Sequence, residues 1–148
     1  MSWQQLLNDK KVKTHTTTFQ ELDALRSVID RDLQDAALSG LSADRRFATA
    51  YNAALQVSKM VIACVGYRVS GASHHQTTFE ALELALGSSV TPLASYFDLC
   101  RRKRNTVDYD IANVASETEA EQILKEAGNL RQIAENWIAH NYPQFKKT

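Results

Sequence analysis

The stretch LSADRRFATAYNAALQVSKMVIACVGYR, residues 41–68, decides the architecture of this protein. Apolar and small side chains recur along it every three or four residues, which is the spacing of one face of an α-helix. That face consists of Phe47, Tyr51, Ala54, Leu55, Ser58, Ile62 and Val65. Ser42 is a suitable N-cap, Asp44 favours the positive end of the helix dipole, and Gly66 is a suitable stop. A helix of this length spans about 36 Å, which predicts the central member of a helical bundle.

The same periodicity predicts helices on both sides of this stretch. They run from about 18 to 38, from Thr77 to just before Gly87, from Pro92 into the basic segment near 101, and from Ser116 to Pro143. No alternating pattern of useful strand length is visible. We therefore expect an all-α, up-and-down bundle of four to five helices. It would form one domain over residues 17–148, preceded by a loosely ordered N-terminal arm at residues 1–16.

Composition restricts the kind of protein. The 148 residues are 44% hydrophobic and 23% charged, which is typical of one soluble globular domain. Lys plus Arg and Asp plus Glu both number 17, so any preference for anions must be local. No apolar run is long enough for a membrane span or a signal peptide, so we expect a cytoplasmic location and no membrane partner. Cys64 and Cys100 lie in apolar helical runs and should be buried thiols, with a disulfide or redox role as the alternative.

A basic segment, LCRRKRNTVDYD at residues 99–110, ends the fourth predicted helix. Adjacent helical residues project about 100° apart, so its four consecutive cations cannot share a face. One face carries Arg101, Arg104, Asn105 and Asp108, with Tyr109 at its edge, and we expect Arg102 and Lys103 to point to solvent. Because the planar guanidinium matches phosphate with two donors, this face predicts an anion site. The alternative is structural: an Arg104–Asp108 ion pair and cations that complement the helix dipole.

Two adjacent histidines, His74 and His75, precede the third predicted helix. Neighbouring histidines seldom bind one metal together, and no Cys, Asp or Glu accompanies them at metal-binding spacing. We therefore expect no metal and no other cofactor. The pair should lie in a loop or at a helix cap, or contribute to a site formed with another segment.

Three segments resemble bacterial members of the HEPN superfamily (higher eukaryotes and prokaryotes nucleotide-binding). They are residues 41–68, SHHQTTFEAL at 73–82 and RRKRNTVDYD at 101–110, and the likeness extends over about 18 to 140. The resemblance implies a homodimer whose arginine motifs meet in a cleft at the interface. It also implies RNA or nucleotide binding, often in toxin–antitoxin or phage-defence systems, with an antitoxin or a nucleotidyltransferase as a further partner. Many members of this superfamily are metal-independent ribonucleases.

Active members carry an Arg, a polar residue and then a His about four to six residues after the Arg. Arg104 and Asn105 match the pair, but Tyr109 stands at the histidine position. A tyrosine with a pKa near 10 is ionised only about one part in a thousand at pH 7, so we expect binding rather than catalysis. Arg101 and Arg104 would hold the phosphate, Asn105 would orient it, and Tyr109 would stack on a base or donate its hydroxyl. The alternatives are a ribonuclease using Arg104 with Tyr109, Asp108 or a loop histidine, and a non-catalytic dimeric adaptor.

Overall fold

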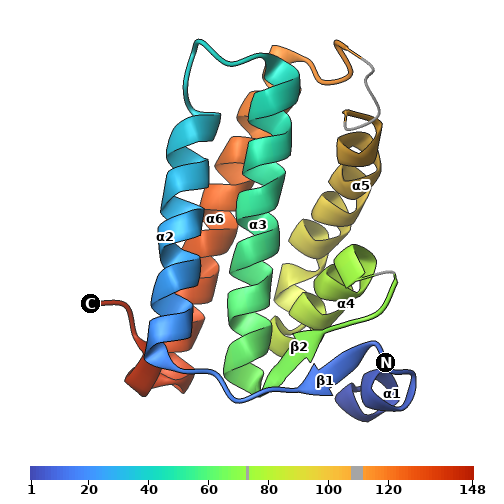
Figure 1. The fold of residues 1–148 in the computed structure, drawn as a ribbon, viewed down its shortest axis with the longest axis vertical. Helices are drawn as coiled ribbons and strands as arrows, with labels where there is room; N and C mark the ends of the chain where they lie inside the picture. The colour runs from blue at the N-terminus through green and yellow to red at the C-terminus, as the bar shows by residue number, and fades with distance from the viewer. Residues whose placement is uncertain (73, 108–111) are drawn as a thin grey trace.

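The chain folds into an up-and-down bundle of α-helices, which confirms the predicted fold class (Figure 1). The structure is a computed structural model that describes residues 1–72, 74–107 and 112–148. The helices are α1 (Trp3–Asn8), α2 (Phe19–Ala36), α3 (Ala43–Val65), α4 (His74–Leu86), α5 (Thr91–Val107) and α6 (Glu117–Asn141). Two short strands, β1 (Val12–Thr14) and β2 (Tyr67–Val69), and two 3₁₀ turns, η1 (Ser88–Val90) and η2 (Pro143–Phe145), complete the described elements.

Helix α3 is the central member of the bundle, as its periodicity predicts. Its N-cap Ser42 accepts a hydrogen bond from the backbone N–H of Arg45, and it ends at Gly66, whose φ of 103° lies in the left-handed region. The helix packs against α2, α4, α5 and α6. In Figure 1, α2 and α5 run upward while α3 and α6 run downward, with α2 and α6 on one side of α3 and α4 and α5 on the other.

Residues 1–16 differ from the expected loosely ordered arm, because they pack against the bundle as α1 and β1. Strand β1 pairs antiparallel with β2, with Val12 opposite Val69. Leu6 and Val12 are 1% and 2% exposed and pack in a small cluster with Ile62 of α3 and Ala81 of α4. This burial depends on a surface that α3 and α4 supply, so the pattern of residues 1–16 alone does not reveal it.

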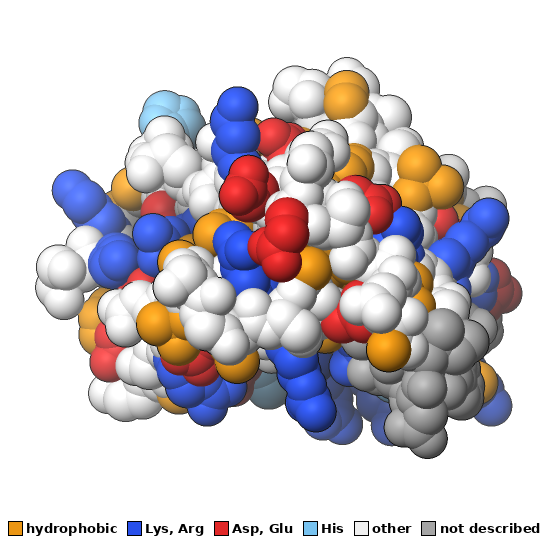
Figure 2. Space-filling model, turned by 90° about the horizontal axis from the view of Figure 1, so that it is seen from above, with side chains coloured by type: hydrophobic (Ala, Val, Ile, Leu, Met, Phe, Trp, Pro, Cys, Tyr) orange, Lys and Arg blue, Asp and Glu red, His pale blue; other side chains and the backbone are white. Residues whose placement is uncertain are grey.

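The end of the bundle that carries the α2–α3 and α5–α6 loops is held by one carboxylate and one guanidinium. Asp44 accepts hydrogen bonds from the backbone N–H groups of Asn113 at 2.8 Å and Ala115 at 2.7 Å. Arg46 donates to the carbonyl of Ala36 and to the carboxylate of Glu117, both at 2.8 Å. Seen from above, acidic and basic side chains of the described residues are interspersed at this end of the molecule (Figure 2).

The first residues of α4 and α5 determine where the predicted site residues lie. Helix α4 begins at His74, three residues before the predicted Thr77, so the two histidines belong to its first turn. Helix α5 begins at Thr91 with Pro92 in its first turn, as predicted, and continues to Val107. No helix in the described ranges has the length and apolar content needed to cross a membrane.

Candidate functional site: a cavity between α4 and α5

The basic face of α5 turns toward α3 and α4. The Nε–H group of Arg101 donates to the Asp98 carboxylate at 3.0 Å, and the Arg101 side chain is 20% exposed. The Arg104 guanidinium lies over the ring of Tyr51 in α3, 5.9 Å from its centroid. Asn105 is exposed, one turn beyond Arg101. The other two members of the predicted face, Asp108 and Tyr109, lie outside the described residues.

The two cations expected to point to solvent behave differently. Arg102 is exposed, as expected. Lys103 is a correction: its Nζ donates to the Glu119 carboxylate and, at 3.4 Å, to the carbonyl of Val114. The Lys103 side chain extends toward α6 because Glu119 lies within its reach in the first turn of that helix. The hydrogen bond from Lys103, followed by that from the Ser116 backbone, lowers the pKa of Glu119. Lys103 therefore links α5 to α6, and Arg101, Arg104 and Asn105 remain the described candidates for the anion site.

A cavity of about 300 Å³ lies where the first turn of α4 meets the last turns of α5. Its lining residues are Ala72, His74, His75, Gln76, Arg101 and Asn105. The structure thus brings together the predicted Arg101 and Asn105 and both histidines. Arg104 is not one of the lining residues, although we expected it to hold the phosphate. The N-terminal end of α4 adds the partial positive charge of a helix dipole to this cavity.

Burial sets the protonation state of His75. Its Nδ1 lies 3.3 Å from the hydroxyl of Tyr51, which is 0% exposed. Burial lowers the pKa of His75 to about 4, and the positive charges of His74, Arg104, Lys59 and Arg101 lower it further in that order. At neutral pH His75 is therefore an uncharged imidazole.

The Tyr51 hydroxyl is the hydrogen-bond partner of that imidazole. Burial raises the pKa of Tyr51 far above its ordinary value, although the charges of Arg104 and then Arg101 oppose the shift. A protonated hydroxyl facing a neutral imidazole can donate to Nδ1 of His75, which leaves Nε2 as the N–H donor. Sequence reasoning placed Tyr51 only in the core. The available signal was a tyrosine in an apolar stripe, because a buried tyrosine usually finds a partner for its hydroxyl.

Neither cysteine lines this cavity. Cys64 and Cys100 are both free and buried, and burial raises the pKa of each thiol to about 11. A thiol with such a pKa stays protonated at neutral pH and is a poor nucleophile. Within the described ranges, no three His, Cys, Asp or Glu side chains gather where they could hold a metal ion.

The lining of the cavity has the chemical groups of an anion site. A guanidinium, a side-chain amide, imidazole groups and a helix N-terminus converge on it, and none of its described lining residues is a carboxylate. In proteins, groups of these kinds donate hydrogen bonds to phosphate. Comparison of the chain with protein-family models, with curated proteins and with solved structures finds no match.

Proposed function

We propose that this protein is a HEPN-like domain that binds the phosphate of an RNA or a nucleotide in the cavity between α4 and α5. One observation carries the proposal: Arg101 and Asn105 of α5 line the same 300 Å³ cavity as His74 and His75 of α4. Among the described residues, Arg101 commits only its Nε–H group to Asp98. Its two terminal nitrogens keep their N–H donors for a ligand.

The arginines and Asn105 take different roles in this proposal. Arg101 provides the bidentate donor that faces the phosphate, and the Asn105 amide orients it. Arg104 contributes positive charge from its place over the Tyr51 ring, in contact with the side chain that presents His75. The stacking of Tyr109 on a base stays a prediction, because Tyr109 lies outside the described residues.

The resemblance extends the proposal to assembly and context. We expect a homodimer that joins two such cavities, in a cell system of the toxin–antitoxin or phage-defence kind, with an antitoxin or a nucleotidyltransferase as a further partner. Sedimentation equilibrium of the purified chain tests the first part directly. A mass of one chain at all concentrations would contradict the dimer.

The binding test compares two neighbouring arginines of one helix. Fluorescence anisotropy with a labelled single-stranded RNA at low salt should show that Arg101→Gln weakens binding about 10- to 100-fold, the cost of one charged hydrogen-bonding pair. Arg102→Gln is the matched control, because it removes the same charge from an exposed side chain that projects away from the cavity. Equal losses in the two variants, or no binding by the unaltered protein, would contradict the proposal.

A metal-independent ribonuclease is the second candidate, and the position of His75 favours it. In the tautomer whose Nδ1–H donates to the Tyr51 hydroxyl oxygen, the unprotonated Nε2 of His75 can accept the proton of an RNA 2′-hydroxyl as that oxygen attacks the phosphorus and displaces the 5′-oxygen of the next nucleotide. With a pKa of about 4, however, His75 is a weak base, and for this reason binding is our first proposal. Incubation of labelled structured RNA with EDTA, using His75→Gln and Arg104→Ala as controls, separates the two. Cleavage that persists in EDTA and disappears in both variants would establish the enzyme.

A further inference from the structure

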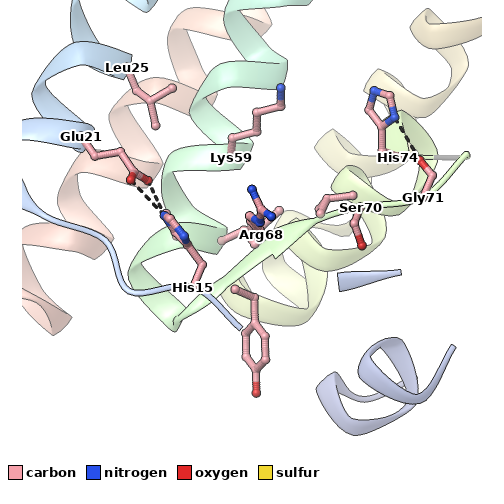
Figure 3. A pocket seen from close by; sticks show the side chains of 12 residues that line it. His15, Glu21, Leu25, Lys59, Arg68, Ser70, Gly71 and His74 are labelled. Atoms are coloured by element: carbon pink, nitrogen blue, oxygen red, sulfur yellow. Dashed lines mark hydrogen bonds and ion pairs between the residues drawn. The ribbon is translucent and has the colours of Figure 1, made fainter. Parts of the chain in front are cut away.

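A second cavity, of about 550 Å³, shares His74 with the first (Figure 3). It lies between α2, α3 and the segment from β2 to Gly71. Figure 3 shows Lys59 of α3 and Arg68 of β2 between the His15–Glu21 pair on one side and His74 on the other. The two cavities are therefore neighbours that meet at the first turn of α4.

The floor of this second cavity is apolar. The half-buried Leu25 and Val69 give it apolar surface, above the almost fully buried Ile62 and Ala63 of α3. Such a surface takes the flat face of an unstacked base more readily than it takes a phosphate or a sugar. The 300 Å³ cavity has mainly polar side chains in its lining, so the two cavities suit different parts of a nucleotide.

The charges around this floor favour an anion. Glu21 is the one carboxylate among the described lining residues, and Nε2 of His15 contacts both of its oxygens, at 2.8 and 2.9 Å. Lys59 and Arg68 make no side-chain hydrogen bond or ion pair with any residue that the structure describes. Two cations without such partners thus stand beside an apolar floor.

We propose that the two cavities form one continuous track for single-stranded RNA. Arg101 and Asn105 hold one phosphate, Lys59 and Arg68 hold an adjacent phosphate, and the base between them lies on the apolar floor. The inference rests on the proposed function and adds the ligand class to it. A mononucleotide carries only one of the two phosphates that these cations would hold, and a duplex keeps its bases stacked inside.

Cations of both cavities lie within electrostatic range of His75. Lys59 of the second cavity and Arg101 of the first both lower the pKa of His75. The charges of the two cavities therefore act on the same imidazole. A strand that crosses His74 would meet cations from α3, β2 and α5 in succession, although these residues are distant in the sequence.

The test compares a short RNA with a mononucleotide in two double variants of equal charge. The variant Lys59→Gln/Arg68→Gln removes two cations from the track. The control Arg45→Gln/Lys125→Gln removes two exposed cations that line neither cavity. Thermal unfolding followed by circular dichroism verifies that both variants are folded. Anisotropy of a labelled ten-nucleotide oligouridylate and calorimetry with uridine monophosphate give the affinities over a range of salt concentrations.

The track predicts that Lys59→Gln/Arg68→Gln weakens oligonucleotide binding about tenfold or more. The slope of log K against log salt concentration should fall by about 0.7, because each neutralised phosphate of a single strand contributes about 0.7 and Lys59 and Arg68 together hold one phosphate. Mononucleotide binding should stay within about twofold, and the control variant should keep both affinities.

Three outcomes would overturn this inference. If the unaltered protein binds neither ligand, the proposed function fails and the track fails with it. If Arg101→Gln weakens RNA binding but Lys59→Gln/Arg68→Gln matches its control, only the track is wrong. If the double variant loses mononucleotide binding as strongly as oligonucleotide binding, the second cavity binds one small anion and is not part of a strand path.

Discussion

Acidification should destabilise this protein through His75, because the folded state opposes protonation of that ring. The imidazole contacts the buried Tyr51 hydroxyl and faces the positive charges of His74, Arg104, Lys59 and Arg101. Its pKa is about 4 when folded, against an ordinary value of 6.5. Between these two values the unfolded chain binds a proton at this ring and the folded chain does not. The free energy of unfolding should therefore fall as the pH falls from 6.5 to 4.

The size of the effect follows from the separation of the two pKa values. A shift from 6.5 to about 4 corresponds to a limit of about 3 kcal/mol, and solvent screening around a partly exposed ring reduces this to about 1–2 kcal/mol. The loss is complete below pH 4 and absent above pH 6.5. For a chain of this size it corresponds to a decrease in melting temperature of about 3–6 °C.

Two measurements check this effect. Proton–nitrogen NMR of the imidazoles gives the titration midpoint of His75 directly. Urea unfolding at several pH values gives the free energy of unfolding of the unaltered protein and of His75→Gln, and the difference between the two proteins isolates this ring from other titrating groups. An NMR midpoint near 6.5, or a difference that stays constant between pH 7 and pH 4, would refute the reasoning.

Three further perturbations test the packing that holds the site in place. Asp44→Ala removes the acceptor of two backbone N–H groups, so urea unfolding should show a loss of about 1–3 kcal/mol, and an unchanged midpoint would contradict that role. Arg26 donates two hydrogen bonds to the Glu135 carboxylate. Arg26→Met should therefore lower the free energy of unfolding by about 3–5 kcal/mol, and the double variant Arg26→Met/Glu135→Met should lower it clearly less. Equal losses in the two variants would mean that the unpaired Glu135 carboxylate has no energetic cost. Cys64 and Cys100 should react with a thiol reagent at neutral pH only after unfolding, and rapid labelling of the native protein would disprove their burial.

Local signals predicted the helices well, because a helix is specified by residues three and four apart and by its caps. Ser116 and Glu119 form the reciprocal capping box whose spacing is visible in the sequence. Thr18 caps α2 through its side-chain oxygen, which accepts a hydrogen bond from the N–H of Glu21. The buried face of α3 was likewise readable from its periodicity. The caps are contacts within one turn of helix, and the periodicity repeats every three or four residues.

The features that the sequence did not reveal depend on contacts between distant segments. Strand β1 forms only because β2 offers it a partner. Lys103 leaves solvent because the first turn of α6 brings Glu119 within reach. The hydroxyl of Tyr51 meets His75 because α4 packs on α3. None of these contacts leaves a periodic signal along the chain.

By itself, the sequence determined an all-α bundle with α3 at its centre and a polar face on α5 that carries Arg101 and Asn105. Side-chain periodicity and helix caps act over a few residues, and a single sequence contains them in full. Only the tertiary structure decided that this face meets the histidines of α4 in one cavity, and that a second cavity with Lys59 and Arg68 adjoins it. Cavities and shifted pKa values arise from the burial of side chains by segments far apart in the chain, and that burial exists only after the helices have packed.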